Sequence, residues 1–287
     1  MKFEKKNHHY VPQYWQRGFR GNGGHLYGRI GNVVKPVSPR NIMQSDWLYT
    51  QFDDQWNPSD ALEDAFAAVE AEDSKLFRRL HIPGYVVTTN DRDHLCAVLA
   101  LQACRHPDVL GRGHRLSKEL GVLLANAHAL SLQQFQQGIA VFGVGSAEAH
   151  DCYLDLRLRT KEQLTTELAE LIGLSPQSSQ LPVHDAIRGM PKIEKAISLM
   201  DLCLLDAVPP ESFVLGDTPL PQADLGRGFS ISLSQSLALV AVPTGTLQSI
   251  LGRRMASAAD VSEINRTQYE NAREVVIGPS AVLLANL

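Results

Sequence analysis

Apolar residues recur at helical spacing through the middle of the chain. In the first such stretch they lie three, four or seven positions apart, and Ser59 stands where a helix takes its N-terminal cap. A second helix is expected to begin at Asn90–Asp91 and to be disturbed at Pro107, because proline has no amide hydrogen to continue a helical ladder. Residues 59–205 are therefore predicted to form a helical body. The apolar positions of its first helix are Leu62, Ala65, Phe66, Val69, Leu76 and Leu80.

Short apolar runs flank this helical body on both sides. Runs of this kind, separated by glycine and proline turns, are typical of strands. They occur at residues 25–30, 32–37, 213–215, 229–232, 238–242, 275–277 and 282–284, and residues 261–273 have the spacing of a last amphipathic helix. Strands at both ends of a helical middle predict an α+β fold in which N- and C-terminal strands share one sheet.

The length of the chain fits one elaborated domain or two modest ones, and we expect the former. Its 287 residues, 44% of them hydrophobic, are enough to bury a large core. Within a single domain over residues 1–287 we expect a β-containing opening segment (1–50), the helical body (59–205) and a strand-rich end with one helix (211–287).

Composition narrows the classes of function. A formal net charge of −4 argues against a protein held to nucleic acid by overall positive charge, although a local basic channel stays open as an alternative. The four cysteines form no C-x-x-C pair, so we expect buried thiols and neither a zinc ribbon nor a redox dithiol. The charged start has no apolar signal region, and no stretch is long and apolar enough to span a bilayer. These features predict a cytoplasmic protein without membrane contact, unless a non-classical export route exists.

The opening segment His8-His9-Tyr10-Val11-Pro12 carries two imidazoles and a phenol within five positions. Adjacent side chains of an extended segment point to opposite faces, so only one of the two histidines is expected to line a given pocket. A solvated N-terminal arm is the alternative. The aromatic residues that follow, Tyr14, Trp15 and Phe19, need burial and therefore predict a docked segment.

Two further places could supply polar groups to a site. Gln102 and Arg105 lie one turn apart near the end of the second predicted helix, where Arg105 either stabilises the helix dipole or grips a phosphate or carboxylate. Asp217 follows the apolar run 213–215, where it either presents a carboxylate or makes an Asx turn. Glu70 lies on the first predicted helix, where we expect a solvated carboxylate in preference to a catalytic one.

Taken together, the H-H-Y-V-P-Q-Y opening, Gln102 with Arg105 and Pro107, the sequence Gly216-Asp217-Thr218-Pro219 and the sequence Glu263-Ile264-Asn265 resemble the bacterial family called domain of unknown function 4238. The similarity spans nearly the whole chain. Trp15 stands where the family has an aliphatic residue, and Phe19 holds the last position of the opening motif. The resemblance implies no activity, but it implies a set of matching polar positions: His9, Gln102, Arg105, Asp217 and Asn265.

Such a set suits general acid–base chemistry on an anionic substrate. We therefore expect a metal-independent hydrolase of a phosphodiester or nucleotide, which includes a toxin-like nuclease. The expected catalytic residues are His9, Arg105 and Asp217, and the expected substrate-binding residues are His8, Tyr10, Gln102 and Asn265.

Two alternatives stay open. The same cluster would serve a non-catalytic small-molecule-binding or sensor module, or would only fix the fold. A metal-dependent variant would use His8 or His9 with Asp217 and Glu70, although no cofactor is expected. The predicted partner is a small anionic ligand or nucleic acid, and the sequence does not identify a protein partner.

Overall fold

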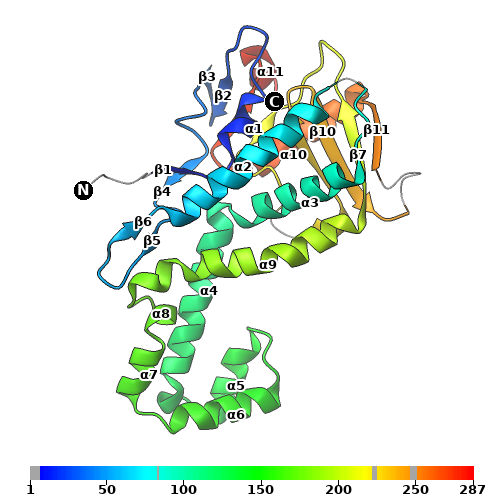
Figure 1. Cartoon of the computed structure of the whole chain (residues 1–287). Coiled ribbons are helices and arrows are strands. Elements are labelled where there is room, and N and C mark those ends of the chain that lie inside the picture. Colours follow the sequence, from blue (N-terminus) through cyan, green and yellow to red (C-terminus); the bar gives the residue numbers. More distant parts are fainter. Residues whose placement is uncertain (1–6, 83, 222–224, 246–250) are drawn as a thin grey trace. The chain divides into compact units, whose positions relative to one another are not determined.

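The computed structural model describes residues 7–82, 84–221, 225–245 and 251–287 (Figure 1). Contacts within the chain group it into two compact units. Among the described residues, the helical unit comprises Tyr49–Leu62 and Asp108–Arg188. The sheet unit comprises Lys5–Leu48, Glu63–Pro107 and Gly189–Leu287. The single-domain organisation expected from the sequence stays a prediction.

The main sheet of the sheet unit has the strand order β11-β7-β10-β9. Its strands are β7 (Met200–Asp206), β9 (Phe229–Ser234), β10 (Leu237–Pro243) and β11 (Leu251–Met255). Strand β7 pairs in parallel with β11 and antiparallel with β10, and β10 pairs antiparallel with β9. The prediction of a helical body up to residue 205 is wrong at its end, because helix α9 (Leu181–Ser198) stops before β7. Strand β7 is apolar on both faces, so its sequence lacks the alternation that marks a half-buried strand.

A second sheet joins the two ends of the chain. Its order is β3-β2-β12-β8, and every neighbouring pair is antiparallel. The strands are β2 (Tyr27–Ile30), β3 (Val33–Pro36), β8 (Leu215–Gly216) and β12 (Val275–Gly278). This confirms the α+β fold and the predicted sharing of a sheet by N- and C-terminal strands.

The strand predicted at residues 282–284 is wrong, because helix α11 (Ala281–Ala285) occupies this place. The hydroxyl of Ser280 accepts a hydrogen bond from the Leu283 amide and caps this short helix. Three consecutive apolar residues fit a short helix as well as a strand, and the cap favours the helix.

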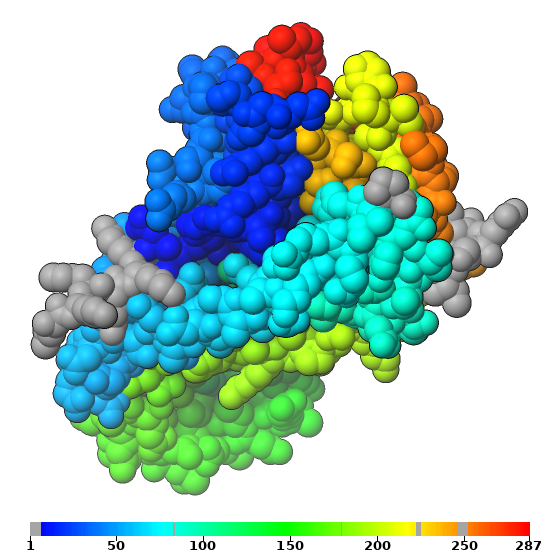
Figure 2. Space-filling model, turned by 45° about the horizontal axis from the view of Figure 1, so that its top comes forward, coloured from blue at the N-terminus to red at the C-terminus, as the bar shows by residue number. Residues whose placement is uncertain are grey.

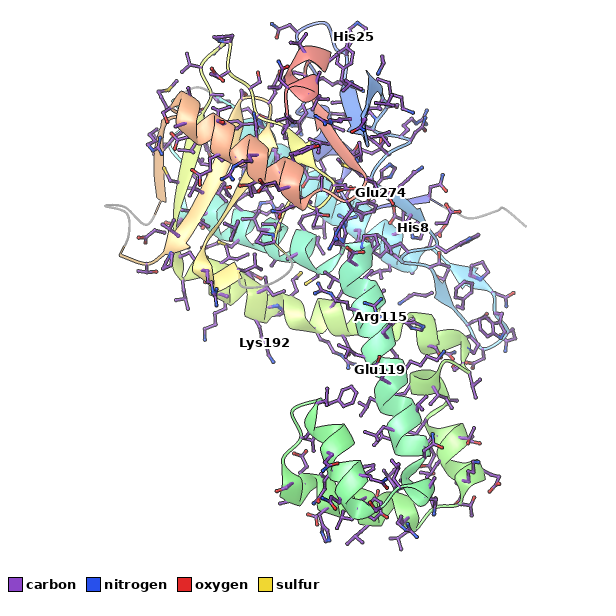
Figure 3. All side chains as sticks on the ribbon, turned by 180° about the vertical axis from the view of Figure 1, so that it is seen from behind. His8, His25, Arg115, Glu119, Lys192 and Glu274 are labelled. Atoms are coloured by element: carbon purple, nitrogen blue, oxygen red, sulfur yellow. The ribbon has the colours of Figure 1, made fainter. Side chains whose placement is uncertain are left out.

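Helices cover both faces of the main sheet. Helices α2 (Ala61–Leu80) and α3 (Thr89–Cys104) lie on one face, and α10 (Ala258–Asn271) lies on the other, as Figures 1 and 3 show from opposite sides. The Asp91 carboxylate accepts hydrogen bonds from Arg79 at the end of α2 and from Thr88 at the start of α3. These bonds fix the turn between the two helices. The core between the helices and the sheet contains Leu76, Leu80, Leu95, Leu99, Leu202, Leu204 and Leu239.

The opening segment is docked, as its aromatic residues predict. Strand β1 (Asn7–His9) pairs with β4 (Gln44–Asp46), and helix α1 (Gln13–Arg17) follows it. Trp15 and Phe19 are fully buried in the core of the sheet unit. The indole nitrogen of Trp15 donates to the Ser232 carbonyl of β9 at 3.0 Å, so α1 is bonded to the main sheet.

The helical unit has a small core of its own. Its helices are α4 (Pro107–Ala125), α5 (Leu132–Ala140), α6 (Ser146–Arg157), α7 (Lys161–Glu167) and α8 (Ala169–Ile172), with the first part of α9 and the hairpin β5 (Gln51–Phe52) and β6 (Pro58–Ser59). Phe135, Ile139, Tyr153, Leu156 and Leu164 pack together in this core. Among the helices that the structure describes, none combines the length and the apolar character needed to cross a bilayer.

Replacing Trp15 by alanine is expected to lower the free energy of unfolding by about 3–5 kcal/mol, because it leaves a cavity in the core and an unpaired Ser232 carbonyl. Urea titration followed by circular dichroism would measure the loss. Trp47→Ala is the matched control, since the Trp47 side chain is 40% exposed. Equal losses in the two variants would contradict the docking of α1.

Candidate functional site

Two residues of α3 hold the backbone of the opening segment. The Gln102 amide donates to the Tyr10 carbonyl at 2.9 Å, and Arg105 donates to the His9 carbonyl at 2.7 Å. The other arm of Arg105 forms an ion pair with Glu70 of α2 at 2.8 Å, and its guanidinium lies over the Phe66 ring. Arg105 is only 4% exposed. The structure thus brings His9, Gln102 and Arg105 together. The partners of Arg105 are the His9 backbone carbonyl and the Glu70 carboxylate.

The two histidines of the opening segment differ in their surroundings. His8 is fully buried and His9 is half-buried, which agrees with the alternation expected for an extended segment. The Nε2 atom of His9 lies 2.8 Å from the Pro39 carbonyl. Burial lowers the pKa of His9, because the charged imidazolium is poorly solvated there. His9 is therefore neutral at pH 7 and donates to Pro39.

Asp217 and Asn265 also bind backbone groups. The Asp217 carboxylate accepts hydrogen bonds from the amides of Arg273, Glu274 and Val275 at 2.7, 2.8 and 3.2 Å, which fixes the start of β12. The side chain of Asn265 accepts from the Val214 amide and donates to the Ser212 carbonyl, both at 2.9 Å. Each side chain thus joins the segment around β8 to the C-terminal part of the chain.

A chain of contacts links the two groups of predicted residues. The Tyr10 ring stands edge-on to His106, with 5.2 Å between ring centroids, and the Nε2 atom of His106 lies 3.2 Å from the Thr218 hydroxyl. Thr218 follows Asp217 directly. Asp217 therefore lies near the opening segment, and His106 and Thr218 are two members of this network that the sequence did not single out.

One more member of the network was missed. Gln268 of α10 is fully buried and clamps the turn around Asp217, accepting from the Gly216 amide at 3.1 Å and donating to the Pro219 carbonyl at 3.0 Å. Gln268 lies three positions after Asn265, one helical turn on, and this spacing was the available signal. Among the described residues, no group of three or more His, Cys, Asp or Glu side chains is arranged to hold a metal ion.

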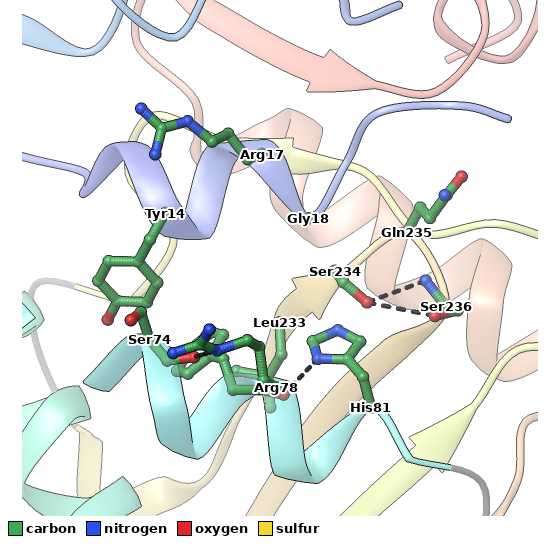
Figure 4. Close-up of a pocket in the computed structure, with 11 residues that line it drawn as sticks. Tyr14, Arg17, Gly18, Ser74, Arg78, His81, Leu233, Ser234, Gln235 and Ser236 are labelled. Carbon is green, nitrogen blue, oxygen red and sulfur yellow. Dashed lines mark hydrogen bonds between the residues drawn. The ribbon is translucent and has the colours of Figure 1, made fainter. Parts of the chain in front are cut away.

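A cavity of about 500 Å³ lies in the sheet unit (Figure 4). We call it the arginine cavity. It is lined by Tyr14, Arg17 and Gly18 from the end of α1, by Ser74, Phe77, Arg78 and His81 from α2 and the residue after it, and by Leu233–Ser236 from the end of β9 and the following turn. In Figure 2 the blue, cyan and yellow-to-orange surfaces of these three segments meet on the face toward the viewer.

The arginine cavity has an apolar wall and a basic rim. The rings of Tyr14 and Phe77 stand edge to face, with 5.2 Å between their centroids, and Leu233 adds aliphatic surface. Arg17 and Arg78 are both exposed to solvent, and the described lining residues include no carboxylate. An apolar wall beside uncompensated arginines suits an anion that carries an apolar group.

The titratable groups of the wall stay neutral at pH 7. Burial and the neighbouring Asp73 carboxylate raise the pKa of Tyr14 far above its usual range. Burial lowers the pKa of His81. The Nδ1 atom of His81 donates to the Phe77 carbonyl, so neutral His81 keeps the lone pair on Nε2.

Small hydroxyl side chains close the cavity on the side of β9. Ser234 accepts from the Ser236 amide at 3.1 Å, and the two serine hydroxyls lie 3.3 Å apart. Glycine at position 18 suits this close approach, because a Cβ atom there would lie 3.1 Å from the Ser234 Cβ, which is tighter than most such contacts. The close approach of α1 to β9 therefore shapes this side of the cavity.

The sequence did not point to this cavity. Tyr14 was singled out for burial alone, and Arg78 and His81 are separated from Ser234 by more than 150 positions. The available signal was local: Ser74, Arg78 and His81 recur at helical spacing on one face of α2.

Asp217→Asn is expected to lower the free energy of unfolding by about 2–3 kcal/mol, because the amide group of asparagine offers a donor to backbone amides that also donate. Chemical denaturation would measure the change. Asp93→Asn is the control, since this carboxylate is 61% exposed. An Asp217→Asn protein as stable as the control would show that the three amide contacts contribute little to the fold.

The lowered pKa of His81 predicts a pH dependence of stability. The folded protein binds a proton at His81 less readily than the unfolded chain, whose histidine titrates near about 6.5. The stabilisation is complete above that pH and is lost as pH falls through the folded pKa. Urea unfolding at pH 7.5 and 5.0 should show a smaller acid-induced loss in His81→Gln than in the unmodified protein, and an identical loss would refute this assignment.

Comparison with known proteins gives one match. A family model described as a protein of unknown function (DUF4238) matches residues 7–281. No curated protein and no solved structure matches the chain. The match covers nearly the full length and includes the opening motif, the Gln102–Arg105 pair, Asp217 and Asn265. The chain therefore belongs to the DUF4238 family of proteins of unknown function.

Proposed function

We propose that this protein is a small-molecule-binding module that takes an anionic ligand with an apolar group in the arginine cavity. The observation that carries the proposal is the lining of that cavity: two exposed arginines, no described carboxylate and an aromatic wall, in a chain whose net charge is −4. A local basic site on an acidic protein marks a place where an anion is preferred.

Binding is better supported than hydrolysis because the expected catalytic groups already serve the fold. Arg105 is buried, and its two terminal nitrogens donate to the Glu70 carboxylate and the His9 carbonyl, so the fork that would bind a phosphate is already in use. Asp217 is 1% exposed and accepts three backbone amides. Moving either group to a substrate would leave buried polar atoms unpaired, which costs about 1–3 kcal/mol for each.

The ligand would be held by different forces at its two ends. Its carboxylate or phosphate would bind Arg78, whose guanidinium group offers paired donors, and Arg17 would add positive charge at the rim. Its apolar part would pack on Phe77, Tyr14 and Leu233. A cavity of about 500 Å³ has the size of sites that hold small organic molecules.

Calorimetric titration with phenylacetate and its neutral analogue phenylacetamide tests this proposal. Phenylacetate should bind at least about tenfold more tightly, because only its carboxylate gains charge-assisted hydrogen bonds to the arginines. Arg78→Gln should remove this preference.

Arg266→Gln provides the matched control, since Arg266 is an exposed arginine of α10 outside the cavity. It should bind phenylacetate as the unmodified protein does. Equal affinity for phenylacetate and phenylacetamide, or equal effects of Arg78→Gln and Arg266→Gln, would contradict the proposal.

A further inference from the structure

A second cavity follows the arginine cavity, and both are lined by residues of segment 17–22 and of the turn after β9. Its volume is about 400 Å³, and we call it the proline cavity. Residues Arg17 and Gly18 line the first cavity, whereas Gly21 and Asn22 line the second. Gln235 and Ser236 line both. The two cavities therefore follow one another along the segment 17–22 and share the turn between β9 and β10.

The shared turn is held rigidly at the boundary. The Gln235 amide donates to the Gly18 carbonyl at 3.0 Å, and its side chain donates to the Arg20 carbonyl at 2.7 Å. On the other side, the Gln235 carbonyl accepts from the Phe213 amide at 2.8 Å. Gly21 approaches the Pro279 carbonyl so closely that a Cβ atom would lie 2.6 Å from it. Both cavities thus belong to one fixed surface.

Opposite charges are separated on the two sides of this turn. The described lining of the arginine cavity carries Arg17 and Arg78 and no acid. The described lining of the proline cavity carries Glu211 and no base. Glu211 is exposed to solvent, so its carboxylate is accessible to a ligand. The exposed Ser236 lines both cavities, and Pro210 and Pro279 add apolar rings to the lining of the proline cavity.

We infer that the ligand is an elongated zwitterion of the short-peptide class that occupies both cavities. Its carboxylate lies at Arg78, its ammonium group lies at Glu211, and its amide groups pass over Gln235 and Ser236. This inference rests on the proposed function, because it extends the same anion site. A ligand with one charge uses only the first cavity and leaves Glu211 without a counter-charge.

Three probes separate the inference from the proposed function: phenylacetate, the tripeptide Ala-Ala-Phe, and N-acetyl-Ala-Ala-Phe, which lacks the ammonium group. Calorimetric titration of the full chain should show the free tripeptide binding about five- to tenfold more tightly than its acetylated form, because only the free form pairs with Glu211. Glu211→Gln should abolish that difference and leave phenylacetate binding unchanged. Glu263→Gln, at an exposed position of α10, is the matched control and should preserve the difference.

The binding results distinguish a failure of the inference from a failure of the proposed function. If phenylacetate binds but acetylation and Glu211→Gln change nothing, the ligand ends in the arginine cavity, and the inference is overturned while the proposed function stands. If neither phenylacetate nor the tripeptides bind, both are overturned. A preference for the free tripeptide that Glu211→Gln removes supports the inference.

Discussion

The buried guanidinium of Arg105 is the interaction on which the sheet unit depends most. It joins the His9 carbonyl of β1, the Glu70 carboxylate of α2 and its own helix α3 at a single point. A buried ion pair contributes little net stability compared with apolar packing, but removing one partner costs about 3–5 kcal/mol, because the other charge stays buried alone. Arg105 therefore contributes more to the geometry of the fold than to its net stability, because it fixes the position of the opening segment. Helix α1, with its cavity-lining residues, follows a few positions later.

Much of the fold was predictable because burial imposes periodicity. Helix α2 showed helical spacing, and β9 and β10 showed short apolar runs between turns. The wrong predictions of secondary structure lie where the apolar pattern does not distinguish a helix from a strand. Strand β7 is buried on both faces, and Val282–Leu284 are too few residues to distinguish strand from helix. The docking of α1 was predictable from Trp15 and Phe19, since large aromatic side chains need burial whatever the local structure.

The candidate site was harder to predict, for a chemical reason. Arg105 and Asp217 were predicted to be catalytic, but a guanidinium binds a backbone carbonyl with the same donors that it offers to a phosphate. An aspartate likewise accepts from backbone amides as it would from a ligand. The sequence therefore gave the polar positions without their partners. The sequence did not predict the arginine cavity, because three segments that meet only in the folded chain form it.

The architectural network and the cavity are connected through electrostatics. Helix α2 carries Asp73 one residue before Ser74 of the cavity lining and Glu70 four residues before it, so free carboxylates there would repel an anion. Arg105 pairs with Glu70, and the Nε2 atom of His94 lies 2.8 Å from Asp73, whose pKa is raised by burial. The Arg105 guanidinium offsets the charge of Glu70, and burial disfavours the charged form of Asp73 behind the wall formed by Tyr14. Arg17 and Arg78 then dominate the local field, which at physiological salt extends only about 8 Å from an exposed charge. The residues that fix the opening segment thus also let an acidic protein present a basic site.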